Sequence, residues 1–296
     1  MLTYLLPESE VFFYRIPIKT LTYTRTHSSL YKLEILYIRT EVVMAKEVKI
    51  IGLESIPEIK TGDDIAKLIV EATEREGVGI RSGDIVVVAS KIIAKAEGRV
   101  IYLDRVVPSK RAIELSNIVG KDPRLVEIIL RESRRVIKAT KGHLIVETKH
   151  GIVCANAGVD KSNVAGREDI VLTLPIDPDR SAREIRYRLY ELTGCDVAVV
   201  VSDTQGRPLR EGQIDVAIGV SGINIFRDYR GTKDLKGYTL KIKRIAIVDE
   251  IASAAELVMG NGSEGVPVAI IRGLLFSSKE ESAKLLNMPK ERWLFK

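Results

Sequence analysis

The sequence predicts a mixed α and β protein, because two kinds of apolar pattern alternate along it. Short runs rich in Val, such as residues 85–89 and 197–201, are typical of strands buried on both faces. Segments such as residues 65–72 instead repeat apolar side chains at helical spacing. With 296 residues, 45% of them hydrophobic, the chain can bury a sizeable core in one large domain or two smaller ones.

The regular part of the chain begins with a strand expected at residues 48–53. Asp63 is expected to cap the helix over residues 65–72. The strand at residues 85–89 then leads directly into Ser90. A polar side chain therefore lies directly after the carboxyl end of this buried strand.

Two short helices are expected next, and their role is packing. Ser109 can cap the first and Gly120 can end it, while Asp122 and Pro123 can begin the second. A strand over residues 144–147 should follow them.

The strand expected at residues 152–155 leads to Asp160, so this acid also lies after a strand. An S-x-x-E pattern at Ser181 predicts the cap of a further helix, and Gly194 predicts its end. That helix should run directly into the strand at residues 197–201.

The strand at residues 197–201 is expected to end abruptly, which places Asp203 and Thr204 at its carboxyl end. Ligands of α/β sheets gather at such ends. A carboxylate and a hydroxyl, followed by Arg207 and Arg210, suit a site for a metal ion and a phosphate group. An Asx-turn capped by Asp203 explains the same pattern, and both interpretations stay open at this point.

The last predicted elements surround a glycine-rich run. Residues 239–248 alternate like a half-exposed strand, and Asp249 is expected to begin a helix that ends at Gly260. The run Gly260–Gly265 matches G-x-G-x-x-G, but a helix precedes it and a strand follows, which reverses the dinucleotide-binding order. A helix end with a turn is favoured for the run alone, and a backbone cradle for phosphate is the alternative.

Composition and charge exclude several classes of protein. The net charge is +6 and the isoelectric point about 9.1, which favours anionic partners. Positive and negative residues are interleaved and only 5% of residues are aromatic, so no nucleic-acid partner is expected. No apolar run reaches the ~18 residues of a membrane span. Cys154 and Cys195 are interpreted as buried reduced thiols, so we expect a cytoplasmic protein without a membrane partner.

Residues 1–43 differ in composition from the rest of the chain. They contain no Gly, Ala or Asp, but hold five of the ten Tyr residues. Either this is a β-rich extension or it is an upstream region that is not translated, and we favour a natural start at Met44.

No local motif identifies the chemistry by itself. The chain has no P-loop, no H-E-x-x-H, no zinc-type cysteine spacing and no nucleophile elbow.

Two nearby carboxylates, such as Asp160 and Asp203, repel by ~1 kcal/mol at 4 Å in water, so such a pair usually needs a cation or a shared proton. A divalent metal ion is therefore expected, with Lys95 and the glycine-rich run binding a nucleotide triphosphate.

Five motifs in order resemble those of the coenzyme F-420:L-glutamate ligases, also called gamma-glutamyl ligases, of archaea and actinobacteria. They are S-K-x-x-x-K-A-E-G-R at residues 90–99, N-A-G-V-D-x-S-N at 156–163, L-P-x-D-P-D-x-S-A at 174–182, S-D-T-x-G-R at 202–207, and M-G-x-x-x-E-G-V-P with I-R-G at 259–273. The resemblance covers roughly residues 48–273. It implies an α+β fold with mixed β-sheets, in which residues 44–296 form one ligase domain of two interleaved subdomains, working as an intertwined homodimer.

The resemblance also implies GTP as a substrate and two divalent metal ions, Mg or Mn, with K⁺ as an optional further ion. Asp160 and Asp203 resemble ligands of one metal, and Thr204 and Asn261 resemble ligands of the other. The residues that resemble nucleotide contacts are Ser55, Ile56, Pro57, Glu58, Ser90, Lys91, Lys95, Asn163, Met259, Gly260, Asn261, Gly262, Ser263, Glu264, Gly265 and Val266.

Two positions depart from the family pattern. Ser55 stands where some members have glycine, and Asn261 stands where some have an acidic metal ligand. An Asn side chain can coordinate through its carbonyl oxygen but brings no charge, and Glu264 is a candidate for supplying that charge.

The chemistry implied by the resemblance is two-step ligation. GTP would phosphorylate the lactyl carboxylate of the deazaflavin precursor coenzyme F-420-0, and the amine of L-glutamate would displace phosphate from the acyl phosphate. A second glutamate would follow by gamma linkage. The expected catalytic residues are Asp160, Asp203, Arg207 and Arg210, with either arginine gripping an anionic substrate group. The alternatives are a ligase that glutamylates a different cofactor acid and a basic nucleic-acid-binding protein without catalysis.

Overall fold

The computed structural model describes residues 47–161 and 169–294. The expectation for residues 1–43 and the position of Asn163 lie outside these described ranges. Within them the protein is a mixture of helices and mixed sheets, which confirms the predicted mixture of α and β. The division into two subdomains and the homodimer remain predictions.

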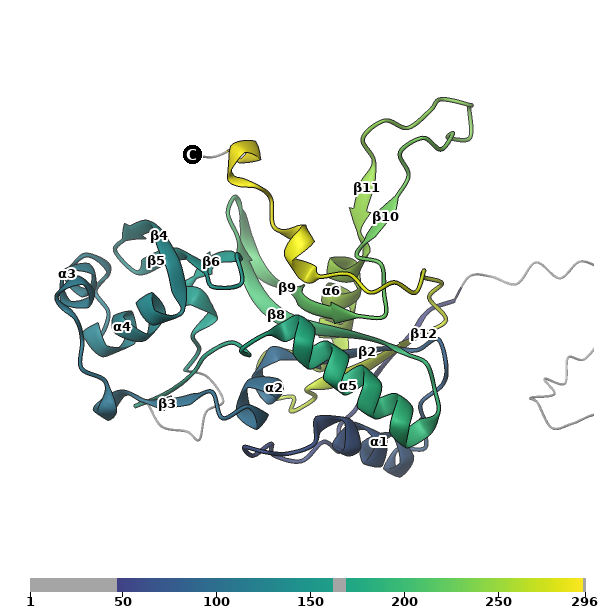
Figure 1. Ribbon diagram of the computed structural model, residues 1–296, viewed down its shortest axis with the longest axis horizontal. Coiled ribbons are helices and arrows are strands. Elements are labelled where there is room, and N and C mark those ends of the chain that lie inside the picture. The colour runs from purple at the N-terminus through teal and green to yellow at the C-terminus, as the bar shows by residue number, and fades with distance from the viewer. Residues whose placement is uncertain (1–46, 162–168, 295–296) are drawn as a thin grey trace, which may run out of the picture. The chain divides into compact units, whose positions relative to one another are not determined.

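A five-stranded mixed sheet forms the centre of the protein (Figure 1). Its strands, in spatial order, are β1 (Lys49–Gly52), β12 (Val268–Arg272), β2 (Ile85–Ala89), β8 (Ala198–Arg207) and β9 (Arg210–Ser221). Strands β2 and β8 run parallel, and every other neighbouring pair is antiparallel. The site described below depends on this one parallel pair.

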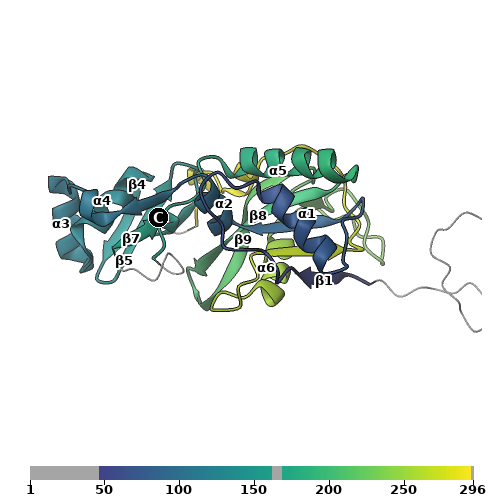
Figure 2. The same ribbon diagram turned by 90° about the horizontal axis from the view of Figure 1, so that it is seen from below.

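Helices cover both faces of the central sheet, and Figure 2 shows α5 and α6 on opposite sides of it. One face is covered by α1 (Ile65–Arg75), α2 (Ser90–Ala96) and α5 (Pro178–Thr193), and the other by α6 (Ile247–Met259). Along β2, Val86 and Val88 pack on the first side, whereas Ile85 and Val87 pack on the second. Burial on both sides explains why β2 is an uninterrupted apolar run.

A second group of elements has its own apolar cluster. Helices α3 (Lys110–Val119) and α4 (Pro123–Arg131) pack on the antiparallel sheet of β4 (Ser133–Thr140), β5 (His143–Thr148) and β6 (Val153–Ala155). Two short antiparallel pairs complete the fold, namely β3 (Val100–Tyr102) with β7 (Ile170–Leu172) and β10 (Phe226–Asp228) with β11 (Arg244–Ala246). None of the described helices combines the length and the apolar character that a membrane crossing requires.

Several predicted helix ends are confirmed. The Ser109 hydroxyl accepts a hydrogen bond from the Ala112 amide at 3.2 Å and so caps α3. Gly120 and Gly194 end α3 and α5 with φ of 68° and 70°, a left-handed conformation that suits glycine. Pro123 occupies the first turn of α4, as expected.

Two predicted helix caps are wrong. Helix α1 is capped by Asp64, whose carboxylate accepts from the Lys67 amide, whereas Asp63 accepts from the Lys60 amide within the preceding turn. Helix α5 begins a turn before Ser181, because Asp177 is its cap. A proline directly after the capping residue favours this earlier start.

Two predicted strands have different lengths. Strand β8 does not end at Val201 but continues to Arg207, because β9 pairs with it along this extension. In the segment 239–248, only residues 244–246 form a strand, and α6 begins at Ile247 rather than at Asp249.

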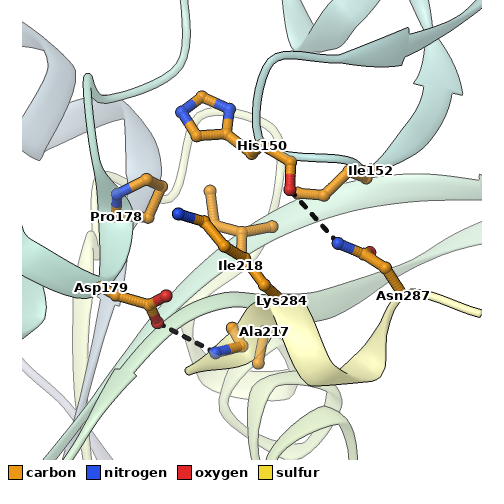
Figure 3. Close-up of a pocket in the computed structure, with 9 residues that line it drawn as sticks. His150, Ile152, Pro178, Asp179, Ala217, Ile218, Lys284 and Asn287 are labelled. Carbon is orange, nitrogen blue, oxygen red and sulfur yellow. Dashed lines mark hydrogen bonds between the residues drawn. The ribbon is translucent and has the colours of Figure 1, made fainter. Parts of the chain in front are cut away.

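The carboxyl-terminal segment is fastened to the central sheet by buried Asp179. Its carboxylate accepts hydrogen bonds from the amides of Val220 and Ala283 at 3.0 Å and from the hydroxyl of Ser282 at 2.6 Å. The side-chain nitrogen of Asn287 donates a hydrogen bond of 3.3 Å to the carbonyl oxygen of His150, and both residues line a small cavity (Figure 3). This segment therefore links the central sheet to the turn between β5 and β6.

We expect Gly219→Ala to destabilise the fold. A Cβ atom on Gly219 would lie 2.3 Å from the carbonyl carbon of Pro178 and 2.4 Å from its oxygen, and backbone cannot rotate away as a side chain can. The free energy of unfolding should fall by about 1–3 kcal/mol or more, as it does when extra atoms are forced into other well-packed cores.

Gly206→Ala is the matched control, because no heavy atom lies within 4 Å of the place that its new methyl group would occupy and its φ is not left-handed. Urea denaturation of both variants gives the comparison. Equal free energies of unfolding for the two variants would contradict the close packing of β9 on α5.

Candidate functional site

The candidate site lies where the carboxyl end of β2 meets the middle of β8. In the parallel register Ala89, the last residue of β2, lies opposite Ser202. Val268, the first residue of β12, lies opposite Val88, so the loop before β12 reaches the same edge. Asp203 and Thr204 follow Ser202, and the pairing therefore places them at this edge although β8 itself continues.

Helix α2 joins the two acids that the sequence predicts as metal ligands. The hydroxyl of Ser90 donates a hydrogen bond of 2.7 Å to Oδ1 of Asp203. The next residue, Lys91, places its Nζ 2.7 Å from Oδ2 of Asp160. Asp160 and Asp203 are thus contacted by neighbouring side chains in the first turn of one helix.

Asp160 is held in place by its backbone. Its amide and carbonyl groups exchange hydrogen bonds of 2.9 and 2.8 Å with Leu172. The turn before it is strained, because Asn156 and Ala157 have φ of 54° and 58°, a conformation that non-glycine residues rarely adopt. Lys121 supports this turn by donating a hydrogen bond of 3.0 Å to the Asn156 side chain.

The environment of Asp203 disfavours its charged form. Burial raises the pKa of Asp203 to about 7, against a hydrogen bond from Ser90 that lowers it. The negative charges of Asp215 and Asp160 raise this pKa further, while Lys91 lowers it. The carboxylate is therefore in a setting that a bound cation would stabilise.

Three side-chain oxygens meet at Thr204, the residue after Asp203. The Oγ1 atom of Thr204 lies 2.7 Å from Oδ1 of Asp215 and 2.7 Å from Oδ1 of Asn261. A threonine hydroxyl has one hydrogen, so it can donate to only one of these two acceptors at a time. The structure thus brings Thr204 and Asn261 together, as the sequence comparison with the family implies, and adds Asp215 to them.

The nucleotide contacts that the sequence predicts near the amino terminus are partly brought together. Lys95 Nζ lies 2.6 Å from Oε1 of Glu58, and its side chain is 16% exposed. Ser55 instead donates from its amide and its hydroxyl to Glu76, at 2.7 and 2.6 Å. Ile56 packs against the apolar core under α1, whereas Pro57 is exposed.

The glycine-rich loop is accessible, and residues 261–265 are exposed. Within it, the Gly262 amide donates 2.7 Å to the carboxylate of Glu264. Met259 is buried in the core, so only its backbone can face a nucleotide. Val266 packs against Gly52, where an added Cβ would lie 2.8 Å from its side chain.

The two predicted substrate-binding arginines lie at the end of the β8–β9 hairpin. The guanidinium of Arg207 donates hydrogen bonds to the carbonyl oxygens of Glu211 and Gly212. Arg210 begins β9 and is exposed. Both therefore lie farther along the hairpin than Thr204, which pairs with Asp215.

Two residues of this region were not predicted from the sequence. Asp215 lies on β9 without any local motif, and only the register of β8 with β9 identifies it. Cys154 lies on β6, where burial and the nearby charge of Asp203 raise the pKa of its thiol to about 12. Both cysteines are free, as expected, but each residue is half-buried rather than buried.

The oxygens of this region are not a cluster of acids alone. Among residues 47–161 and 169–294, no group of three or more His, Cys, Asp and Glu side chains is arranged to hold a metal ion. The candidate donors instead combine carboxylates with a hydroxyl and an amide oxygen. The cavity in Figure 3 is separate from this region. None of the nine residues that line it is a predicted site residue.

Comparison with known proteins identifies close relatives. A family model described as F420-0:Gamma-glutamyl ligase matches residues 54–273. Coenzyme F420:L-glutamate ligase of Methanothermobacter thermautotrophicus is 45% identical over 251 residues, which cover 84% of this chain and 99% of that protein. The protein of the same name from Methanopyrus kandleri is 49% identical over 225 residues, 75% of this chain and 86% of its own. That of Methanocaldococcus jannaschii is 46% identical over 253 residues, 85% and 98% respectively.

Asp203→Asn should stabilise the metal-free protein at alkaline pH. An acid whose pKa is raised from 3.8 to about 7 contributes stability that is present below pH ~4 and lost as the pH rises through 7. The amide side chain of the variant stays neutral at every pH, whereas the wild-type carboxyl must ionise in its buried position as the pH rises. The free energy of unfolding of the variant should therefore exceed that of the wild type by about 1–3 kcal/mol at pH 8.

The difference should shrink at pH 5, where folded Asp203 is protonated. Urea denaturation in the presence of a chelator at the two pH values measures it. Asp196→Asn, an exposed acid just before β8, provides the control. A variant less stable than the wild type at pH 8 would contradict the assigned environment of Asp203.

Proposed function

Because the chain belongs to the F420-0:Gamma-glutamyl ligase family, we propose that it uses GTP to join L-glutamate to coenzyme F-420-0. The name shared by its relatives, Coenzyme F420:L-glutamate ligase, supports this acceptor and this amino acid. The proposed route is through an acyl phosphate, with a second glutamate added by gamma linkage. We also propose that the working protein is a homodimer.

The observation that carries the proposal is the contact of helix α2 with both acids. Ser90 holds Asp203 and Lys91 holds Asp160, so the helix that follows β2 brings the two carboxylates to one edge of the sheet. Without a cation, burial raises the pKa of Asp203, and the negative charge of Asp160 raises it further. Such an arrangement supports binding of a divalent metal ion together with an anionic phosphate chain.

The donor set fits the two metal ions of the proposal. Asp160 and Asp203 would hold one ion, and Thr204 and Asn261 would contribute oxygens to the other. A buried hydroxyl in the same stretch, that of Ser202, has no hydrogen-bond partner among the described residues. When bound, the ions would neutralise negative charge on the phosphoryl group in transfer.

The positive side chains and the loop would position the nucleotide. Lys91 and Lys95 lie one helical turn apart on α2 and carry charge toward the same edge. The exposed loop of residues 261–265 can approach phosphate oxygens closely, because its glycines carry no side chains to shield the backbone. Holding both reactants in one site can supply ~7–11 kcal/mol of the barrier.

Bond making and breaking in the proposed reaction balance in two steps. A carboxylate oxygen of the acceptor takes the terminal phosphoryl group of GTP, which releases GDP. The glutamate nitrogen then attacks the acyl carbon, phosphate leaves, and the amine loses its proton.

The test is mass spectrometry of coenzyme F-420-0 incubated with the protein, L-glutamate, GTP and Mg²⁺ or Mn²⁺. We expect metal-dependent addition of one or two glutamyl groups. Asp203→Ala should reduce product formation by at least ~100-fold, because a ligand and a charge are both lost. Asp196→Asn, which alters an exposed ion pair with Arg186, should retain activity.

If the protein glutamylated other carboxylic acids but not F-420-0, the ligase reaction would be supported and the proposed acceptor would be wrong. Absence of product with every acid, by a folded protein, would overturn the proposal.

Loss of both predicted arginines should weaken binding of an anionic substrate. In Arg207→Ala/Arg210→Ala, we expect the KM for F-420-0 or glutamate to rise by ~10-fold or more, since two charged hydrogen-bond donors are removed. Arg207 also donates a hydrogen bond to the backbone of the hairpin. Circular dichroism and the urea midpoint should therefore establish that the double variant is still folded. Unchanged KM and kcat would remove these arginines from the site.

A further inference from the structure

We propose that Asp215 is the acidic ligand that completes the second divalent cation site, together with Thr204 and Asn261. This inference rests on the proposed function, since it concerns an ion of the proposed reaction. It assigns a metal-binding role to a strand residue that lies in none of the five sequence motifs.

The three oxygens converge across strands and loop. Thr204 and Asp215 are direct partners in the antiparallel β8–β9 register, so their side chains leave the sheet on the same side. Asn261 follows the end of α6, and its Oδ1 lies as close to Thr204 Oγ1 as does that of Asp215, at 2.7 Å. Because one hydroxyl hydrogen serves two acceptors, at least one of these oxygen pairs lacks a proton between them. A cation would attract all three oxygens.

The orientation of the Asn261 amide is fixed by a second contact. Its nitrogen donates 2.9 Å to Oε1 of Glu256 on α6. This hydrogen bond directs the carbonyl oxygen, rather than the nitrogen, toward Thr204. Oxygen is the donor that Mg²⁺ and Mn²⁺ prefer.

Asp215 is held at its position by the surrounding structure. The residue is 6% exposed, and its backbone carbonyl accepts a hydrogen bond of 2.7 Å from the Ser253 hydroxyl on α6. A carboxylate this well buried usually needs a partner charge. The buried Ser202 hydroxyl, without a partner among the described residues, lies two residues before Thr204 and on the same side of β8.

Glu264 is the other acid that the sequence offers for this site, and the structure turns it elsewhere. Its Oε2 accepts the Gly262 amide at 2.7 Å, and its side chain folds over Gly260. Thr204 and Asn261 are both neutral, so Asp215 is the one of the three converging side chains that brings a negative charge.

A positioning role for Asp215 is the competing explanation. In that case Asp215 would only accept the Thr204 hydroxyl hydrogen and orient it. An Asn side chain at position 215 can still accept that hydrogen through its carbonyl oxygen, but it cannot supply charge. Asp215→Asn therefore separates the two roles.

The experiment counts bound Mn²⁺ by electron paramagnetic resonance, with manganese alone added to the full chain. We expect two sites per chain in the wild type. Asp215→Asn should weaken one of them by at least ~10-fold and leave the other unchanged, as loss of a ligand charge predicts. Asp215→Asn/Asn261→Asp restores the carboxylate from the other side of Thr204, and the weakened site should recover.

Full affinity of both sites in Asp215→Asn would overturn the inference, as would a wild type with fewer than two sites. Far-ultraviolet circular dichroism establishes that each variant is folded, and recovery in the double variant excludes general damage. These measurements need no turnover. A failed glutamyl transfer would therefore leave the manganese result interpretable, and the failure of one proposal is distinguishable from that of the other.

Discussion

The parallel pairing of β2 with β8 is the constraint on which the site depends. It places Ala89 opposite Ser202, so that α2 begins beside the middle of β8 and Ser90 reaches Asp203. Strand β2 and residues 198–201 of β8 can be apolar because helices cover the two faces of the sheet. Polar groups therefore gather at the edge where β2 ends, while β8 continues beside β9.

The protein concentrates unfavourable features at this edge. Burial raises the pKa of Asp203 to about 7, and consecutive left-handed residues precede Asp160. Left-handed backbone in non-glycine residues costs about 1–3 kcal/mol each, and the cost is tolerated only where the surrounding structure enforces it. Here the backbone hydrogen bonds between Asp160 and Leu172, together with the buried sheet, hold this stretch of backbone in place. Clusters of this kind are typical of functional sites.

Much of the fold could be predicted because its signals are local. Strand β2 has its predicted bounds, and Ser109, Gly120 and Gly194 lie at helix ends as expected, since each acts on its own turn of backbone. The errors arose where a distant partner decides the outcome. Strand β8 runs past Val201 because β9 supplies hydrogen bonds, although Ser, Asp, Thr and Gly in sequence resemble a turn.

The sequence by itself determined the mixture of helices and strands and the family, because these follow from local patterns and motif order. It also predicted Asp160 and Asp203 as metal ligands, and that role stays a prediction. Only the tertiary structure decided which side chains meet. It joined Ser90 to Asp203, turned Glu264 toward Gly262, and placed Asp215 against Thr204. The physical reason is that strand register sets these contacts: a shift of one residue would turn Asp215 to the opposite face of the sheet.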